Sequence, residues 1–383
     1  MAYDRKLIFH GISKNINNYI IGRVVTKNFE QVDNKNQLIM VSEKNEYVPG
    51  YKAYITNDNF KQLDDKIIKS CYGVKNIEHF IDGDIVRISD DGLIRILYRI
   101  DSDDNVIFVT NQCNSNCIMC PDSDLVRKNG ENVSIEELIE YIDYIPKDCK
   151  HLTITGGEPG LLKDNLIILL RECQKRLPNT NYLLLTNGRV FSDEKYLKKI
   201  VEVLPDNIRF GIPLYSSDEE IHDGITMAKN SFRQTVYAIK RMLEYDISIE
   251  IRTVVLKKNY NSLIKLSDYI IKEFKNVDVV NFMALEVLGN CLKNKKEVWI
   301  NFEDINKYLL PSCLNLIKNR INVQLYNFPL CLIDSKLISL AKNSITDYKI
   351  KYKKECEICR ARNLCGGFFF STVNMKEINV KPL

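Results

Sequence analysis

The sequence predicts an α/β fold, in which a partial, six-unit barrel of parallel strands lies between a β-rich domain and a cysteine-rich extension. Three observations lead to this prediction. β-branched runs fill residues 1–103, strand-like and helix-like runs alternate over residues 104–295, and cysteines gather again within residues 296–383. We take these three ranges as the predicted domains, in keeping with roughly 150 residues per domain.

The first domain is predicted from runs rich in β-branched residues at 18–27, 36–43 and 84–100. Within the last run, residues 89–92 read SDDG, which supplies a turn between two strands. We find no group of catalytic residues in this domain, so it is expected to support or cap the next one.

The second domain is predicted from regular alternation. Strands are expected at 105–111, 151–157, 181–188, 207–215, 247–256 and 277–285, and helices at 134–145, 162–176, 192–204, 231–245 and 261–274. Such alternation implies a parallel sheet with helices outside it. Six strands are too few for a complete eight-stranded barrel. We therefore predict a partial, TIM-like barrel, followed by one more helix near 303–319.

Composition narrows the functional classes. Apolar residues make up 45% and charged residues 27% of the chain, as in ordinary globular proteins. Its apolar runs are shorter than the ~20 residues of a membrane span, and the N-terminal stretch lacks the apolar segment of a secretion signal. We expect a cytoplasmic protein without membrane contact. The net charge of +4 is small, which argues against a nucleic-acid partner.

Twelve cysteines need an explanation other than disulfides, because the cytosol keeps thiols reduced. One group lies within eight residues and comprises Cys113, Cys117 and Cys120. A second group comprises Cys331, Cys356, Cys359 and Cys365. The other five are expected to be small buried apolar residues: Cys71, Cys149, Cys173, Cys291 and Cys313.

The first cysteine group lies in the loop TNQCNSNCIMCPD, residues 110–122, directly after the first barrel strand. Loops at this end of parallel strands build active sites in α/β folds. A structural zinc site would take four ligands, whereas three thiolates on a four-iron cubane leave one iron open to a cofactor or substrate. The pattern favours an iron–sulfur site with an open iron.

The next βα loop reads TGGEP. Gly156 and Gly157 permit close approach of the backbone to a ligand, Glu158 offers a carboxylate, and Pro159 fixes the exit of the loop. CxxxCxxC followed one βα unit later by GGEP resembles the radical S-adenosylmethionine (radical SAM) superfamily. One departure is Met119, where the residue before the third cysteine is often aromatic.

The resemblance implies cofactors and roles for particular residues. Cys113, Cys117 and Cys120 would hold a 4Fe–4S cluster whose fourth iron binds S-adenosyl-L-methionine. The residues implied to line or border this cofactor are Gly156, Gly157, Glu158, Pro159, Thr186, Asn187, Gly188, Ser216 and Arg252. His222 and Asp223 are expected to set the structure of their loop.

The chemistry that the resemblance implies is reductive cleavage of S-adenosylmethionine to a 5′-deoxyadenosyl radical, which takes a hydrogen atom from the substrate. An electron donor such as flavodoxin or ferredoxin is then needed. The cofactor supplies the difficult step, so we predict no residue that catalyses by acid–base chemistry.

The second cysteine group suits either tetrahedral zinc or a fully ligated cluster. The segment CEICRARNLCGGFFF resembles the SPASM and twitch extensions of radical SAM proteins, which implies one auxiliary 4Fe–4S cluster, with zinc as the alternative. Cys331 would supply the fourth thiolate beside Cys356, Cys359 and Cys365.

A narrower resemblance is to the His-Xaa-Ser system radical SAM maturases of the HxsC type. It is carried by CNSNCIMC, FMALEVLGN, YNFPLC, SITDYK, CEICRARNLCGGFF and the lead-in GDIVRISDDGLIRILY. It implies a ribosomally made precursor peptide or small protein as substrate, and a partner radical SAM maturase. Glu286 would face the site as a substrate contact. The β-rich domain could bind the precursor by adding a strand to a sheet edge.

Two alternatives remain open at this point. One is a radical SAM enzyme that acts on RNA or on a small molecule. The other, from a different class, is a non-catalytic zinc-binding protein that uses both cysteine groups structurally. The zinc protein would be colourless, whereas an iron–sulfur protein prepared without oxygen would be brown.

Overall fold

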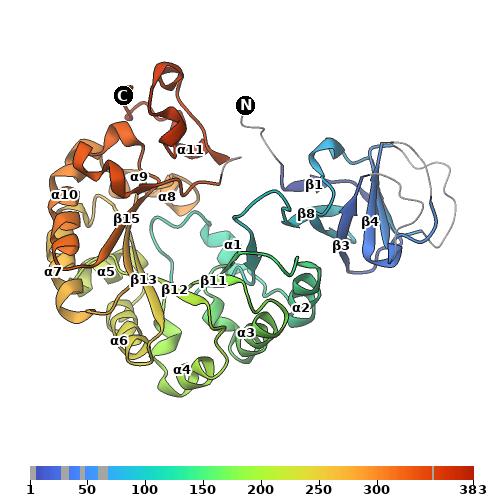
Figure 1. Cartoon of the computed structure of the whole chain (residues 1–383), viewed down its shortest axis with the longest axis horizontal. Coiled ribbons are helices and arrows are strands. Elements are labelled where there is room, and N and C mark those ends of the chain that lie inside the picture. Colours follow the sequence, from blue (N-terminus) through green and yellow to red (C-terminus); the bar gives the residue numbers. More distant parts are fainter. Residues whose placement is uncertain (1–5, 27–33, 44–47, 59–67, 347–348) are drawn as a thin grey trace.

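The computed structural model describes residues 6–26, 34–43, 48–58, 68–346 and 349–383. Residues 1–5 of the N-terminal stretch and residues 347–348 of the motif at 344–349 lie outside this description. Figure 1 shows an arc of strands with helices on its outer side, and a separate β-rich lobe beyond α1 and α2. The predicted α/β fold with a partial parallel barrel is confirmed.

The N-terminal lobe is one sheet with the strand order β1-β8-β7-β3-β4-β5-β6-β2. Its strands are β1 (Ile8–His10), β2 (Ile12–Lys14), β3 (Tyr19–Val25), β4 (Leu38–Ser42), β5 (Ala53–Thr56), β6 (Ser70–Tyr72), β7 (Ile85–Ser89) and β8 (Leu93–Tyr98). The predicted SDDG turn connects β7 to β8, which pair antiparallel.

This sheet closes on itself at Gly11. β1 and β2 stand at opposite ends of the strand order, yet only Gly11 separates them in the chain. A Cβ on Gly11 would lie 2.7 Å from the sulfur of Cys71, so only glycine fits the bend. The strands at the two ends of the order, β1 and β2, are the edges left among the described strands, and each is three residues long. They offer little room for the strand addition expected from the sequence.

The second sheet is the barrel, and its strand order β16-β15-β14-β13-β12-β11-β10-β9 is the order of the strands along the chain. Every neighbouring pair is parallel. The strands are β9 (Val106–Phe108), β10 (His151–Thr155), β11 (Asn181–Leu185), β12 (Ile208–Pro213), β13 (Ser248–Val254), β14 (Val279–Met283), β15 (Asn322–Tyr326) and β16 (Ala341–Lys342). The six predicted strands are β9–β14, and β15 and β16 continue the sheet into the predicted extension.

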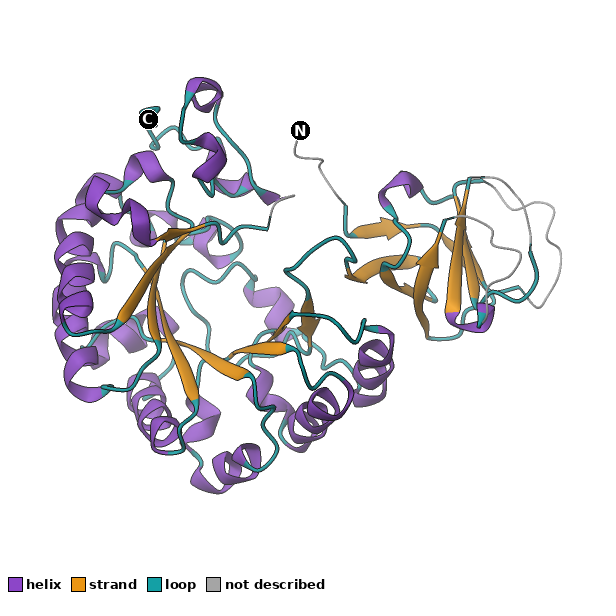
Figure 2. Cartoon of the chain, in the orientation of Figure 1, coloured by secondary structure: helices purple, strands orange, loops and turns teal. Residues whose placement is uncertain are grey.

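Helices that follow the barrel strands cover the outer face of the arc (Figure 2). The helices of the described residues are α1 (Asp124–Lys128), α2 (Ile135–Tyr144), α3 (Asp164–Arg176), α4 (Glu194–Val201), α5 (Glu219–Thr226), α6 (Ser231–Glu244), α7 (Leu263–Glu273), α8 (Asn290–Lys293), α9 (Lys295–Val298), α10 (Phe302–Lys318) and α11 (Phe370–Val373), the last of which lies in the C-terminal extension. Three begin at side-chain caps that accept backbone N–H groups, namely Ser134, Asp193 and Asp218.

The barrel core lies between the sheet and its helices. Phe210, Phe282, Leu266 and Ile270 are among its fully buried members, contributed by β12, β14 and α7. The five scattered cysteines are all buried and unpaired, as predicted. The core continues into the N-terminal lobe, because Ile21 and Ile85 belong to the same apolar cluster.

Polar contacts tie the lobe to α2. Arg87 pairs with Glu137 at 2.6 Å, and Lys52 pairs with Glu140 at 2.8 Å. Arg23 Nη2 donates to the carbonyl of Tyr144 at 2.6 Å. The lobe therefore packs on α2, away from β15 and β16. Domain boundaries at 103/104 and 295/296 stay a prediction.

None of the helices among the described residues combines the length and the apolar character that a membrane crossing requires.

Candidate functional site

The three-cysteine loop follows β9 and ends at α1, at the carboxyl end of the parallel strands. Cys113, Cys117 and Cys120 are half-buried and carry free thiols. The end of α5 holds the middle of the loop, since Asn116 N and Ile118 N donate to the carbonyls of Thr226 and Ile225, each at 2.9 Å. The loop is therefore anchored by its backbone.

The GGEP loop packs directly against the start of the cysteine loop. Gly157 N donates to Thr110 O at 2.7 Å, and Glu158 N donates to Gln112 O at 2.8 Å. A Cβ on Gly156 or Gly157 would overlap the carbonyl oxygen of Thr110 or Gln112, respectively. Both glycines are thus required for the close approach of two backbones, a reason that the sequence did not reveal.

Glu158 connects the GGEP loop to the turn after β11. Its side chain is completely buried. Oε1 accepts from Thr186 Oγ1 at 2.6 Å and from Gly160 N at 2.9 Å, and Oε2 accepts from Asn187 N at 2.6 Å. Burial raises the pKa of this carboxyl, and these donors oppose the rise. All three donors to this carboxyl group are groups of the protein itself.

The turn after β11 in turn holds the cysteine loop. Gly188 has φ of 79°, the left-handed conformation that glycine tolerates. Asn187 Nδ2 donates to Asn114 Oδ1 at 2.6 Å, and Arg189 hydrogen-bonds the carbonyl of Asn114 and, at 3.1 Å, Ser115 Oγ. Arg189 was missed by sequence reasoning, although it directly follows the predicted Thr186–Gly188 turn in the printed LTNGR.

A third anchor comes from the segment after β14. Asn290 N donates to Cys120 O at 2.9 Å, and Asn294 Nδ2 donates to Ile118 O at 2.9 Å. Gly289 has φ of 55°, and a Cβ there would overlap the carbonyl of Pro121. More than 170 residues separate Asn290 and Asn294 from the loop that they hold, so no local signal in the sequence could identify them.

The environment of the cysteines disfavours free thiolates. Burial is the main cause, and it raises the pKa of Cys113 and Cys120 and brings that of Cys117 to about 12. Arg127 opposes these shifts at all three thiols. Its guanidinium also donates to Ser115 O at 2.8 Å. A ligand with positive charge, such as a metal cluster, is therefore needed to hold all three as thiolates.

Ser216 and His222 serve the loop after β12. Ser216 is fully buried, and its Oγ accepts from Asp218 N at 3.1 Å. His222 is also buried; its Nδ1 accepts from Tyr215 N at 3.3 Å, and Nε2 lies 3.2 Å from Ser231 Oγ. Asp223 accepts from Phe232 N at 2.7 Å. The expected structural roles of His222 and Asp223 are confirmed.

A large cavity lies inside the barrel mouth, with a volume of about 1360 Å³ that includes its opening to solvent. The cysteine loop, the strand ends and the C-terminal extension all line it, through Met119, Pro121, Arg252, Glu286, Tyr326, Asn343, Ser344 and Phe369. This cavity is where a substrate would meet the cysteine loop.

Two charged side chains of this cavity differ in their pairing. Arg252 pairs with the buried Glu250 and lies 5.5 Å from the centre of the Tyr326 ring. Glu286 shows no side-chain hydrogen bond or ion pair within the described part of the chain. Burial raises its pKa, and Lys349 opposes that rise. Glu286 is therefore a carboxylate of the cavity that a cationic group could approach.

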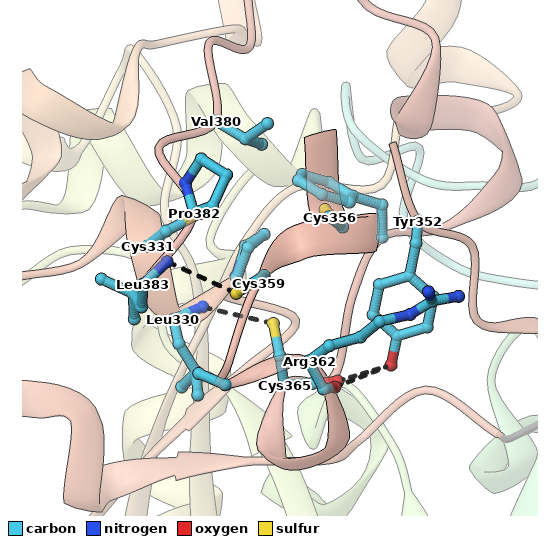
Figure 3. Close-up of a pocket in the computed structure, with 13 residues that line it drawn as sticks. Leu330, Cys331, Tyr352, Cys356, Cys359, Arg362, Cys365, Val380, Pro382 and Leu383 are labelled. Carbon is cyan, nitrogen blue, oxygen red and sulfur yellow. Dashed lines mark hydrogen bonds between the residues drawn. The ribbon is translucent and has the colours of Figure 1, made fainter. Parts of the chain in front are cut away.

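The second cysteine group surrounds its own pocket (Figure 3). Cys331 lies in the turn η6 (Leu330–Leu332) and Cys356 in η9 (Lys354–Ile358). Cys359 follows η9, and Cys365 follows η10 (Arg362–Leu364). All four side chains line a cavity of about 370 Å³, open mouth included. The structure thus brings together the four cysteines that the sequence grouped.

Backbone N–H groups point at these sulfurs. Leu330 N lies 3.5 Å from Cys365 Sγ, Gly367 N 3.4 Å from the same sulfur, and Leu383 N 3.4 Å from Cys359 Sγ. Such donors stabilise anionic sulfur and tune metal–sulfur centres. The described residues contain no set of three or more His, Cys, Asp or Glu side chains already placed to hold a metal ion.

Comparison with known proteins identifies the family. Residues 107–270 match the radical SAM superfamily, which spans the cysteine loop, GGEP and the turn after β11. An uncharacterized protein of Methanocaldococcus jannaschii is 31% identical over 214 residues, covering 53% of this chain and 69% of that protein. The chain belongs to the radical SAM superfamily. Membership implies a 4Fe–4S cluster and S-adenosylmethionine as cofactors, and the donor set of three cysteines on one anchored loop fits that cluster.

Other relatives match over smaller parts of their own length. GTP 3′,8-cyclase of Clostridium perfringens strain SM101 is 26% identical over 197 residues, which are 49% of this chain and 57% of the cyclase. The antilisterial bacteriocin subtilosin biosynthesis protein AlbA of Bacillus subtilis is 31% identical over 153 residues, 39% of this chain and 33% of AlbA. The chain therefore spans about a third to two thirds of these proteins.

Among solved structures, native anSMEcpe with bound AdoMet and Cp18Cys peptide superposes with a TM-score of 0.51. The two chains are 16% identical, and the match covers 73% of this chain and 92% of the other. At this identity the likeness supports the radical SAM fold alone.

Proposed function

We propose that this radical SAM enzyme is a maturase of the His-Xaa-Ser type, which modifies a ribosomally synthesised peptide or small protein. The observation that carries the proposal is the cavity of about 1360 Å³ between the cysteine loop and the extension. The lining of this cavity includes Glu286, Ser344 and Phe369, which lie in motifs shared with the HxsC-type maturases. The motifs shared with the HxsC-type maturases, and the likeness to a protein named for bacteriocin biosynthesis, support the same substrate class.

The proposal assigns Cys113, Cys117 and Cys120 as ligands of the first cluster. The bound cluster and S-adenosylmethionine supply reductive cleavage of the sulfonium and abstraction of a hydrogen atom. The residues that we assign to the cofactor's surroundings are Gly156, Gly157, Glu158, Pro159, Thr186, Asn187, Gly188, Ser216 and Arg252.

Within this set, the hydrogen bonds described above distinguish residues that position the loops from residues that could contact the cofactor directly. Glu158, Thr186 and Asn187 fix the positions of three loops relative to one another, and Ser216 supports the loop after β12. We assign the direct contacts to the half-buried backbone of Gly156 and Gly157 and to the guanidinium of Arg252. Preorganised loops of this kind orient a reacting group without reorganisation during the reaction.

Glu286 and the extension are assigned to the substrate. Glu286 lies in the same cavity as Met119 of the cysteine loop, and Phe369 lines the wall that the extension supplies. A carboxylate in a partly buried cavity attracts a cationic side chain, which suits a precursor that carries imidazole or amine groups. Met119 of the cysteine loop is almost completely buried and helps to exclude water.

The proposal places an auxiliary 4Fe–4S cluster on Cys331, Cys356, Cys359 and Cys365, with zinc as the alternative. Support comes from the shared pocket and from the N–H groups directed at two of the sulfurs. The proposed partners are the precursor, a second radical SAM maturase and a flavodoxin- or ferredoxin-type electron donor, and the proposed location is the cytoplasm.

A second candidate function is conversion of a small molecule, favoured by the relative named GTP 3′,8-cyclase. The wall that the C-terminal extension supplies to the cavity favours the peptide.

Co-expression with a candidate His-Xaa-Ser precursor tests the proposed function. We expect a mass change in the precursor with the native enzyme and none with Cys113→Ala. Cys149→Ala is the matched control, because Cys149 is a buried cysteine outside both groups. An unmodified precursor beside an enzyme that cleaves S-adenosylmethionine would reject the peptide substrate, and GTP turnover by that enzyme would favour the second candidate.

A further inference from the structure

Charge and exposed apolar side chains gather beside the second cysteine group. Residues 349–364 contain six basic and two acidic side chains, so this segment alone carries a net +4, equal to the net charge of the whole chain. The remaining residues are balanced. The basic side chains are Lys349, Lys351, Lys353, Lys354, Arg360 and Arg362.

Two apolar side chains project from the same segment. Ile358 is 81% exposed and Leu364 is 74% exposed, the highest values among the large apolar residues that the structure describes. Isolated exposed apolar residues are common. These two, however, immediately precede Cys359 and Cys365, which line the proposed cluster pocket. Adjacent Cα atoms are about 3.8 Å apart, so this surface lies within one peptide unit of the cluster ligands.

The basic side chains beside them remain available. Lys354, Arg360 and Arg362 are exposed, and none of them forms an ion pair within the described ranges. Arg362 is held in place by the ring of Tyr352, 4.9 Å from its guanidinium carbon. An apolar centre with a charged rim is the usual composition of a protein-binding surface.

We propose that this surface, defined by Lys354, Ile358, Arg360, Arg362 and Leu364, is the docking site of an acidic one-electron carrier protein. The inference rests on the proposed auxiliary cluster. The carrier's acidic face pairs with the basic rim, while Ile358 and Leu364 contact the apolar surround of its redox group. One electron passes from the reduced carrier to the cluster, the carrier is oxidised by one electron, and no bond forms or breaks.

Physical reasons favour this occupant over the precursor. Electron carriers form small, transient interfaces that depend on charge complementarity for rapid association. A chain whose net charge of +4 is matched by that of one short segment suits that mode. The precursor must instead reach the cavity at the barrel mouth, whose lining residues are different from those of this surface.

The test uses the full-length enzyme, reconstituted without oxygen, and flavodoxin as the probe. The variant is Ile358→Asp with Arg360→Glu. The matched control is Ile264→Asp with Lys265→Glu on α7, since Ile264 is also exposed, at 38%. Binding is followed by titration, and electron transfer by the rate at which reduced flavodoxin bleaches the cluster. Dithionite, a small reductant that needs no docking surface, provides the second rate.

We expect the variant to weaken flavodoxin binding at least about tenfold and to slow reduction by flavodoxin by a similar factor. Binding to the native enzyme should weaken as ionic strength rises to about 0.5 M. The control pair and the rate with dithionite should be unchanged. The docking site is refuted if the variant binds flavodoxin with unchanged affinity. It is also refuted if the variant loses precursor binding or self-association instead of flavodoxin binding.

A separate variant distinguishes this failure from failure of the cluster itself. Cys356→Ala with Cys359→Ala should lose the iron of the second site only. If its iron content equals that of the native enzyme, the auxiliary cluster is refuted and the docking site with it. If iron is lost there but Ile358→Asp with Arg360→Glu binds flavodoxin normally, only the docking site is refuted.

Discussion

Substitution of Glu158 by glutamine is the perturbation whose effect can be worked out most fully from the structure. Oε1 accepts two hydrogen bonds, from Thr186 Oγ1 and Gly160 N, and Oε2 accepts one from Asn187 N. A glutamine keeps the first two if its oxygen takes the place of Oε1. Its NH₂ group then faces the N–H of Asn187, donor against donor. The flipped amide instead leaves Gly160 N without an acceptor, because the Thr186 hydroxyl can rotate and accept from the NH₂ group.

The expected cost follows from the unmade bond. A buried donor left without a partner costs about 1–3 kcal/mol, and bonds to a charged acceptor lie in the upper part of that range. Removal of a buried charge gives back part of the loss, since burial already raises the pKa of Glu158 and so disfavours its ionised form. We expect Glu158→Gln to reduce the unfolding free energy of the barrel by about 2 kcal/mol.

Urea titration of the iron-free protein measures this difference. Trp299, the single tryptophan, packs in the apolar cluster beside the cysteine loop, and its fluorescence reports on that region. Asp164→Asn is the control, because the Asp164 side chain is 83% exposed and should change stability by less than about 0.5 kcal/mol. If Glu158→Gln proves no more destabilising than Asp164→Asn, Glu158 does not connect the loops as described.

Three further predictions concern the loop anchor, a buried histidine and the cavity. Gly289→Ala should lower the iron content of the first site, because the added methyl group overlaps the carbonyl of Pro121; full iron loading would contradict this anchor. Burial lowers the pKa of His222 from 6.5 to about 4. Between pH 6.5 and 4, the imidazole is therefore protonated in the unfolded chain and neutral in the folded one. Stability should therefore fall by up to about 3 kcal/mol as the pH drops from 6.5 to 4. Unfolding titrations of His222→Gln should show a shallower dependence, and an equal slope would reject the assignment. Glu286→Gln should reduce precursor modification about tenfold or more while cleavage of S-adenosylmethionine continues, as chromatography of the products would show; a parallel loss of both would place Glu286 with the cofactor instead.

The barrel could be predicted from sequence because its signals are local. Alternating strand and helix runs are set by hydrophobic periodicity, which residues such as Phe210 and Leu266 reveal within their own segments. β15 was missed because the segment between β14 and α10 interrupts the regular alternation of strands and helices. β16 has two residues, too few for any pattern to appear.

The contacts that position the site were largely hidden for a different reason. Asn290 and Asn294 reach the cysteine loop across more than 170 residues of sequence, and an asparagine gives no sign of its distant partner. Gly156 and Gly157 were predicted to allow close approach to a ligand, and the structure shows that their missing side chains make room for another backbone. Closure of the N-terminal sheet at Gly11 likewise depends on which strands end up next to each other, and it leaves only short edges for a peptide.

Electron paramagnetic resonance of the reduced enzyme, with and without S-adenosylmethionine, tests the central claim most directly. We predict a 4Fe–4S signal that changes shape when S-adenosylmethionine is added, and whose responsive part is absent from the variant with alanine at Cys113, Cys117 and Cys120. A signal whose shape does not change when S-adenosylmethionine is added, or a responsive signal that persists in this variant, would contradict the assignment of an open iron to the three-cysteine loop.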